Sequence, residues 1–213
     1  MKLDVIILAA GQGSRMNLGY NKMFHFIDDI TIIEKSIRAF SSNNNINNII
    51  ITYNEGELDS IKEICDEYKP IYVEGGLERY LSVINALKYV ESEYVLIHDG
   101  ARCYINNEQI NDISHASIKY GAACLGVLSK DTIHICDNDN NIIETTNRSN
   151  TYIAQTPQGF KTSLIKDAYQ QVLKNNDSII TDDVMVFNKY SNNKVKMVLS
   201  DYNNIKVTTK DDL

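Results

Sequence analysis

The sequence predicts a one-domain α/β protein built on a mainly parallel sheet, with helices on both faces and a projecting β-arm. Short apolar runs alternate with stretches of helical periodicity through the first 128 residues, a pattern typical of β-α-β units. The alternation breaks between residues 129 and 155, where two short runs flank a polar turn. Because a single hydrophobic core keeps growing to roughly 250 residues, we expect one domain over residues 1–213.

Apolar runs of strand length occur six times, at Leu3–Leu8, Ile49–Tyr53, Ile71–Val73, Tyr94–His98, Ala122–Leu128 and Val195–Leu199. Between these runs, apolar residues recur at helical spacing, and each set predicts one buried helix face. The sets are Ile30, Ile33, Ile37 and Phe40; Leu58, Ile61, Cys65 and Tyr68; Tyr80, Val83, Leu87 and Val90; Ile110, Ile113 and Ala116; Leu164, Ala168 and Val172; and Val184, Phe187 and Tyr190. Gly121 follows the fourth set and is typical of a helix C-cap that leads into a strand.

The segment 129–155 predicts a β-hairpin arm rather than another crossover helix. Its two short runs, 132–135 and 142–145, lie on either side of the polar turn 137–141. The segment is too polar, and its apolar runs are too short, for it to be buried on the chain's own sheet. Since a two-stranded excursion is marginal in water by itself, we expect a partner to cover it.

Composition and charge argue against several classes of function. The net charge of −7 disfavours a nucleic-acid groove, which needs a concentrated positive field. No apolar run approaches the ~20 residues of a membrane span, and the opening run Val5–Ala10 is too short for a signal-peptide core, so the cytoplasm is the expected location. The four cysteines have no CxxC pair and no metal-like spacing with histidines, which predicts free thiols and no zinc site.

The first strand runs into a glycine-rich turn, LAAGQGSRM at residues 8–16, which is followed by Asn21-Lys22. Such a turn lets backbone N–H groups approach phosphate oxygens, and Arg15 and Lys22 add positive charge. The match to known phosphate loops is partial, because the third glycine of the dinucleotide fingerprint and the Gly-Lys-Ser/Thr of a P-loop are both missing. A plain tight turn with solvated Arg15 and Lys22 is the alternative.

Two further segments follow strand ends and carry candidate ligand-binding residues. Asp99 comes directly after an apolar strand, where open α/β sheets bind ligands, and suits a ribose, a metal or a phosphate-bound Mg²⁺. The alternative is an aspartate that caps the next helix, and we interpret the adjacent His98 as a structural hydrogen-bonding residue rather than a base. In the second segment, the backbone of Gly75 and Gly76 could contact a flat base edge, although a simple turn explains these glycines equally well.

Nine motifs occur in the order and at the spacing of one family: AAGQGSRM, NKMF, GGLERYLSV, HDGAR, KDT, TNRS, AQTPQGF, TDD and NIKVTTKDDL. Over essentially its whole length the sequence resembles the cytidylyltransferases that act on 2-C-methyl-D-erythritol 4-phosphate in the non-mevalonate isoprenoid pathway. The resemblance implies a Rossmann-like nucleotidyltransferase fold, Mg²⁺ as cofactor, and a reaction of CTP with this polyol phosphate that releases pyrophosphate. The alternatives are a cytidylyltransferase for ribitol 5-phosphate or another polyol phosphate and, more remotely, a catalytically silent binding module.

The resemblance also implies roles for individual residues. Phosphate neutralisation and catalysis would belong to Arg15, Lys22 and Lys206. The CTP-binding residues would be Ala9, Ala10, Gly11, Gly13, Gly76, Ser82, Asp99 and Gly100, and Asp99 would also face the Mg²⁺. The acceptor-binding residues would be Arg102, Thr132, Arg148, Thr156 and Thr181. Because Thr132 and Arg148 lie on the predicted arm, they would act in the site of a second subunit, which implies a homodimer.

Several positions depart from the family pattern. Cys103 stands where proline is usual, Leu77 where a polar residue is usual, and Asn147 where an acid is usual. Ser200-Asp201 replaces the usual Gly-Ser, and Asn21 takes the place of a proline. Leu77 puts one side-chain contact to cytosine in doubt, and Asp201 is expected to add negative charge near Lys206.

Overall fold

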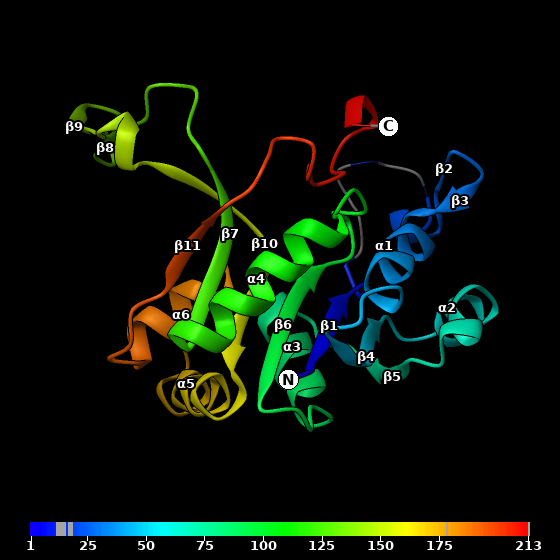
Figure 1. Cartoon of the computed structure of the whole chain (residues 1–213). Coiled ribbons are helices and arrows are strands. Elements are labelled where there is room, and N and C mark those ends of the chain that lie inside the picture. The colour runs from blue at the N-terminus through cyan, green and yellow to red at the C-terminus, as the bar shows by residue number, and fades with distance from the viewer. Residues whose placement is uncertain (12–15, 17–18, 178, 213) are drawn as a thin grey trace.

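A mixed seven-stranded sheet, in the spatial order β11-β7-β10-β6-β1-β4-β5, forms the centre of the molecule (Figure 1). The computed structural model describes residues 1–11, 16, 19–177 and 179–212. The strands are β1 (Leu3–Leu8), β4 (Ile46–Tyr53), β5 (Ile71–Glu74), β6 (Tyr94–Asp99), β7 (Ala122–Leu128), β10 (Tyr152–Lys161) and β11 (Lys196–Leu199). All neighbouring strands pair in parallel except β10, which is antiparallel to both β6 and β7. The expected α/β class with a mainly parallel sheet is therefore confirmed.

Helices cover both faces of this sheet, and alternation along each strand supplies the two layers of the core. In β1, Leu3, Val5 and Ile7 point into one hydrophobic cluster, whereas Ile6 belongs to the other. The first cluster packs against α1 (Ile32–Ser41), α2 (Leu58–Cys65) and α4 (Asn107–Tyr120). The second packs against α3 (Arg79–Leu87), α5 (Thr162–Asn175) and α6 (Asp183–Tyr190).

Local signals explain where several of these helices begin and end. Thr31 caps α1 by accepting a hydrogen bond from the backbone of Glu34. A reciprocal capping box between Asn106 and Gln109 starts α4. At the other end of α4, Gly121 has a φ of 82°, the left-handed C-cap that its position in the sequence predicted. The short elements are η2 (Lys22–Phe24), β2 (Phe26–Ile27), β3 (Ile30–Thr31), η3 (Asp66–Tyr68), η4 (Arg148–Asn150) and η5 (Lys210–Asp212).

The strand β10 is the main element that the apolar pattern did not predict. Its central residues are buried although several of them are polar, among them Gln155, Thr156 and Gln158. Each of these side chains has a hydrogen-bond partner, and these hydrogen bonds offset the free-energy cost of removing the polar groups from water. A search for apolar runs therefore passes over the strand that separates β6 from β7.

The segment 129–155 leaves the sheet as an arm, and its two short runs pair as expected. The strands β8 (His134–Cys136) and β9 (Ile142–Thr145) form a separate two-stranded antiparallel sheet. This small sheet lies away from the body of the molecule (Figure 1). The last residues of the segment, from Tyr152 onward, already belong to β10. All residues of β8 and β9 are exposed in the single chain.

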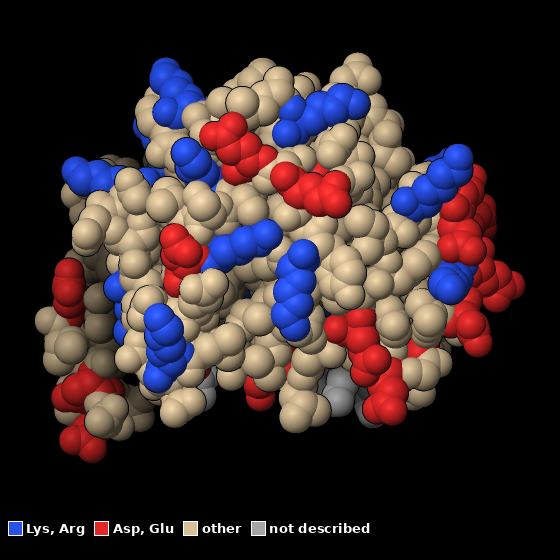
Figure 2. All heavy atoms as spheres, turned by 90° about the horizontal axis from the view of Figure 1, so that it is seen from below, with Lys and Arg blue, Asp and Glu red and all other residues tan. Residues whose placement is uncertain are grey.

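Figure 2 shows the face formed at the amino ends of the parallel strands. Lys and Arg side chains are spread among Asp and Glu on this face, and acidic side chains gather on the side where α2 lies. Within the described residues, no helix is long and apolar enough to cross a membrane.

Candidate active site

A cleft of about 830 Å³ opens at the carboxyl ends of the parallel strands. This is the edge of an open α/β sheet at which ligands bind. The residues that line it come from the ends of β1, β4, β5 and β6, from the first turn of α3, from the η2 turn, from the loops between these elements and from the C-terminal segment. They include Ala10, Gly11, Lys22, Thr52, Glu55, Glu74, Gly75, Gly76, Leu77, Glu78, Arg79, Ser82, Asp99, Lys206 and Thr208.

The two glycines after β5 hold one wall of the cleft in close contact with its neighbours. A Cβ atom on Gly75 would lie 2.4 Å from the Cβ of Ala10 and 2.9 Å from the Oγ of Ser82. The N–H of Gly76 donates to the Oγ of Ser82 at 3.0 Å. Leu77, the next residue, has 98% of its surface exposed at the edge of the cleft. Both glycines of the predicted segment therefore line the cleft, and Leu77 adds an apolar residue to the same wall.

The end of β1 and the residues that follow it line the cleft through Leu8, Ala10 and Gly11. Ala9 lies behind them and is buried: its N–H donates to Thr52, and its carbonyl accepts a hydrogen bond from Asn21. The predicted residues Gly13 and Arg15 lie outside the residues that the structure describes.

Lys22 is presented to the cleft by a capped turn. The side chain of Asn21 accepts a hydrogen bond from the backbone of Met23 and donates to the Ala9 carbonyl at 3.1 Å and to Glu57 at 2.8 Å. This arrangement ties the turn both to the end of β1 and to the start of α2. The Nζ atom of Lys22 donates to the carbonyl of Val207 at 2.7 Å.

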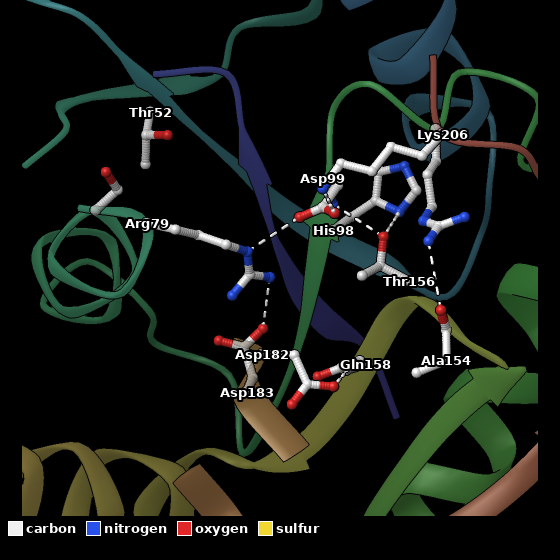
Figure 3. A network of polar contacts seen from close by, with 12 residues as sticks. Thr52, Arg79, His98, Asp99, Ala154, Thr156, Gln158, Asp182, Asp183 and Lys206 are labelled. Carbon is white, nitrogen blue, oxygen red and sulfur yellow. Dashed lines mark hydrogen bonds and ion pairs between the residues drawn. The ribbon is translucent and has the colours of Figure 1, made fainter. Parts of the chain in front are cut away.

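Asp99 lies between two cations at the floor of the cleft (Figure 3). One of its oxygens accepts from Arg79 Nε at 3.1 Å, and the other accepts from Lys206 Nζ at 2.7 Å. Burial alone would raise the pKa of this carboxyl, but Arg79 and Lys206 lower it well below its usual value. Asp99 is therefore a carboxylate at neutral pH.

A second carboxylate, Asp183, holds the other side of the Arg79 guanidinium. Nη2 of Arg79 donates to Asp183 at 2.7 Å, and the hydroxyl of Tyr169 donates to the second oxygen of the same carboxylate. Desolvation would lower the pKa of Arg79, but Asp183 and Asp99 raise it well above its usual value. Sequence reasoning assigned no role to Arg79 or Asp183, although both lie within motifs that carried the resemblance.

The C-terminal segment crosses the end of the sheet and brings Lys206 to Asp99. Its backbone is held by Lys22 at Val207 and by Arg102, which donates to the carbonyl of Asn204 at 2.9 Å. The Val207 N–H donates in turn to Ala101. Two of the predicted cationic residues thus contact this segment directly.

His98 and Thr156 lie directly behind Asp99. The Thr156 hydroxyl accepts the N–H of Asp99 at 2.9 Å and lies 3.2 Å from His98 Nδ1. The ring of His98 is fully buried and makes an edge contact with Phe40. Burial lowers the pKa of His98 to about 3, so that the ring is neutral at pH 7. This agrees with a structural role for His98. Gly100 is also packed closely, since a Cβ there would lie 2.6 Å from Met23.

Not all of the predicted residues come together in the cleft of one chain. Thr132 and Arg148 are exposed on the arm and do not line the cleft. Thr181 is exposed just before α6, where its hydroxyl contacts the sulfur of Met185. Arg102 and Thr156 lie next to the cleft but are engaged with the backbone around it.

The positions that depart from the family pattern have ordinary local roles. Cys103 is buried, and burial raises the pKa of its thiol to about 11. Asn147 caps η4 by accepting from the backbone of Ser149. Asp201 accepts hydrogen bonds from Gln109 and the backbone of Asn203, while Lys206 is paired with Asp99.

A doubly wound sheet with a glycine-walled, lysine-bearing cleft at its carboxyl edge is the arrangement of an α/β nucleotide-binding protein. Comparison with known proteins narrows this class. The family model described as 2-C-methyl-D-erythritol 4-phosphate cytidylyltransferase matches residues 3–213. The chain belongs to this family.

Individual relatives agree with the family model over more than nine-tenths of their length. The chain is 38% identical over 220 residues to the 2-C-methyl-D-erythritol 4-phosphate cytidylyltransferase of Lachnoclostridium phytofermentans, covering 100% of this chain and 93% of the relative. It is 40% identical over 214 residues to that of Bacillus thuringiensis, covering 98% and 93%. The crystal structure of 4-diphosphocytidyl-2C-methyl-D-erythritol synthase from Anaerococcus prevotii superimposes with a TM-score of 0.88 at 33% identity, covering 99% of this chain and 94% of that one.

Proposed function

We propose that this chain transfers the cytidylyl group of CTP to the phosphate of 2-C-methyl-D-erythritol 4-phosphate and releases pyrophosphate. The observation that best supports this is the convergence of Lys22 and Lys206, from opposite ends of the chain, on one glycine-walled cleft. Family membership supplies the choice of nucleotide and acceptor.

The polarity of the cleft fits one orientation of the nucleotide. Two of its four acidic lining residues, Glu55 and Glu74, follow or end the strands β4 and β5, on one side of β1. Lys206 pairs with Asp99 at the end of β6, on the other side of β1. A triphosphate is repelled by the first side and attracted by the second. The cytosine would therefore lie against Gly75 and Gly76, with the phosphates toward the lysines.

The reaction needs position and positive charge rather than a general base. A phosphomonoester dianion is already a nucleophile, and its oxygen can attack the α-phosphorus in line while pyrophosphate leaves. Lys22 and Lys206 would neutralise the charge that develops on the phosphoryl oxygens. Arg15 is proposed to share this task.

Mg²⁺ fits the cleft as a cation held chiefly by the substrate. The described residues contain no group of three or more His, Cys, Asp or Glu side chains arranged to hold a metal. Mg²⁺ commonly uses only one or two carboxylates together with substrate phosphates. Asp99 keeps lone pairs beyond the two that accept from Arg79 and Lys206, so it can be that carboxylate. Bound there, Mg²⁺ would neutralise part of the triphosphate charge.

The acceptor is proposed to bind where two subunits meet. Ile142 and Ile143 on the arm are 60% and 65% exposed, an apolar surface that a partner would cover. Thr132 and Arg148 would then contribute to the partner's cleft, beside its Thr156 and Thr181. A homodimer with two shared sites follows from this arrangement.

Pyrophosphate release, measured with each nucleotide and acceptor in turn, tests the proposal. We expect turnover with CTP and 2-C-methyl-D-erythritol 4-phosphate, and far less with ATP or GTP, because purines are too large for the wall formed by Ala10 and Gly76. Faster turnover with ribitol 5-phosphate would assign the chain to the alternative acceptor. No release with any polyol phosphate, despite CTP binding, would indicate a binding module.

A further inference from the structure

Arg79 is the only residue drawn in Figure 3 whose side chain joins two carboxylates of different elements. Its Nε contacts Asp99 at the end of β6, and its Nη2 contacts Asp183, the first residue of α6. Asp99 lines the cleft, whereas Asp183 is fully buried and does not. The guanidinium therefore connects the cleft to a helix on one face of the sheet.

The start of α6 is fixed by a set of hydrogen bonds in addition to Arg79. Asp182 caps the helix through the backbone of Met185, and its second oxygen accepts from Gln158 Nε2 at 2.9 Å. Gln158 also accepts the N–H of Val184 at 3.0 Å. A helix start held from β10 and from Arg79 has little freedom to move relative to Asp99. Thr181 is the residue immediately before this capped start.

We propose that Arg79 is a positioning residue that couples the acceptor side of the site to its nucleotide side. By holding Asp99 and Asp183 at once, it sets the place of Thr181 relative to the carboxylate that faces CTP. This inference rests on the proposed function, which assigns Thr181 to the acceptor and Asp99 to the nucleotide.

A guanidinium suits this task because its donors form a rigid planar fork that can contact two carboxylates in fixed directions. A lysine ammonium at position 79 would keep the positive charge, but on a single nitrogen at the end of a flexible stem. The Arg79→Lys substitution therefore separates charge from bridging geometry. Displacement of a substrate-positioning residue by 1 Å can cost about 100-fold in rate, so loss of the bridge should be measurable.

Asp183→Asn is the complementary change on the other side of the bridge. The amide oxygen can accept either from Tyr169 or from Arg79, whereas the carboxylate in the native protein accepts from both. Tyr169→Phe is the matched control, since it removes the other partner of Asp183 and leaves the contact with Arg79 in place. Lys189→Met is a second control, because Lys189 forms an exposed ion pair with Asp177 and is located at the opposite end of α6.

Steady-state kinetics with CTP and 2-C-methyl-D-erythritol 4-phosphate distinguish the bridge from a general loss of structure. We expect Arg79→Lys and Asp183→Asn each to raise the acceptor KM by about 10- to 100-fold. For Asp183→Asn, the CTP KM should stay within about twofold of the native value. Tyr169→Phe should lower the melting temperature yet leave the acceptor KM nearly unchanged, and Lys189→Met should change neither.

The double variant tests whether the two residues act through each other. If they do, Arg79→Lys combined with Asp183→Asn raises the acceptor KM no further than the stronger single change. A direct contact between Arg79 and substrate would instead make the two effects multiply. Multiplying effects, or an acceptor KM that Asp183→Asn leaves unchanged, would overturn the proposal.

Hydrogen exchange gives a readout that does not depend on acceptor turnover. Binding of CTP should slow amide exchange at residues 182–186 in the native protein and in Tyr169→Phe, but not in Arg79→Lys. Equal protection in Arg79→Lys would reject the coupling even if that variant were inactive or unstable at higher temperature. If the native protein bound CTP but used a different acceptor, the proposed function would fail while this exchange experiment still tested the bridge.

Discussion

Lys22 and Val207 are 185 residues apart in the chain, yet the Nζ atom of one donates a hydrogen bond of 2.7 Å to the carbonyl of the other. This contact joins the turn after β1 to the C-terminal segment that carries Lys206. The ammonium group of Lys22 thus contacts the residue that directly follows Lys206 in the chain. A triphosphate that drew Lys22 away from Val207 would therefore also act on the segment that holds Lys206.

Lys22→Ala is expected to remove most activity while leaving the fold in place. Loss of one donor to a phosphoryl transition state typically lowers kcat by about 100-fold or more. Asn21 holds the turn, and the variant loses the hydrogen bond from Lys22 to Val207, which contributes about 1 kcal/mol, so the melting temperature should fall by about 2 to 4 °C. Steady-state kinetics and thermal unfolding measure the two quantities.

Lys35→Ala provides the comparison for this variant. Lys35 forms an exposed ion pair with Asp28 at 2.9 Å, and it does not line the cleft. The Lys35→Ala variant should keep both native activity and native stability. A near-native kcat in Lys22→Ala would show that Lys22 does not stabilise the transition state, and an unfolded variant would assign it a structural role.

Gly75→Ala is expected to weaken CTP binding by displacing a wall of the cleft. The new Cβ would meet the Cβ of Ala10 at 2.4 Å, so the loops after β1 and β5 must separate. An increase of about tenfold in the CTP dissociation constant, measured by calorimetry, corresponds to a modest 1.4 kcal/mol. Unchanged binding would mean that this wall does not contact the nucleotide.

Gly11→Ala tests close approach of the nucleotide without disturbing the protein. Among the residues that the structure describes, no atom would lie within 4 Å of a Cβ on Gly11. The variant should therefore fold as the native chain does. Weaker CTP binding in Gly11→Ala would report a contact made by the ligand itself, and native binding would remove Gly11 from the predicted CTP site.

Most of the sheet could be predicted because most of its strands contain a short run of apolar residues. The bounds of β1 and β7 agree with the predicted runs, and the expected strand 49–53 is the end of the longer β4. The strand β10 could not be found in this way, since Gln155 and Gln158 are polar but buried. Gln155 bonds to the backbone of Asp201 and Gln158 to the side chain of Asp182. Both partners are distant in sequence, so the local pattern does not indicate the hydrogen bonds that offset the cost of burial.

The candidate site, too, could be predicted only in part from the sequence. Gly75, Gly76 and Asp99 were found because strand ends in a parallel sheet share one edge, a rule that needs only local signals. The pairing of Arg79 with Asp183 joins residues 104 apart and depends on α3 and α6 packing against the same hydrophobic cluster. Such a contact depends on tertiary structure and is invisible to motif spacing.

His98 should make the stability of the protein depend on pH in the acid range. Its pKa is about 3 in the folded protein, against a usual value of 6.5, because the ring is buried. Between these values the unfolded chain binds a proton at this residue that the folded chain does not. The folded state is therefore favoured above pH 6.5 and loses about 1.4 kcal/mol per pH unit, from this group, as the pH falls toward 3.

His98→Asn should remove this contribution and flatten the dependence, whatever it does to stability at neutral pH. Urea unfolding between pH 4 and pH 7 measures the slope in the two proteins. His115→Asn, at an exposed position of α4, should keep the native slope. Equal slopes in the native protein and in His98→Asn would show that His98 is protonated when folded.

Arg148→Ala tests the arm. Arg148 is exposed, lies outside the cleft of its own chain, and is carried by a segment whose apolar residues Ile142 and Ile143 are exposed in the single chain. If its guanidinium binds the acceptor phosphate in a second subunit, the acceptor KM should rise by about 10- to 100-fold with CTP binding nearly unchanged. Asn138→Ala, in the exposed turn of the arm, should leave both constants at native values.

Mixing two impaired variants, assayed at an acceptor concentration well below the KM of Arg148→Ala, makes the test specific for a shared site. In a heterodimer of Arg148→Ala with Lys22→Ala, one cleft has an intact Lys22 from its own chain and an intact Arg148 from the partner, whereas the other cleft lacks both. Subunit exchange should therefore restore activity to roughly a quarter of the native level, because about half of the dimers are mixed and each has one complete site of two. A chain that sediments as a monomer at micromolar concentration, or mixtures that stay inactive after verified exchange, would exclude the shared site.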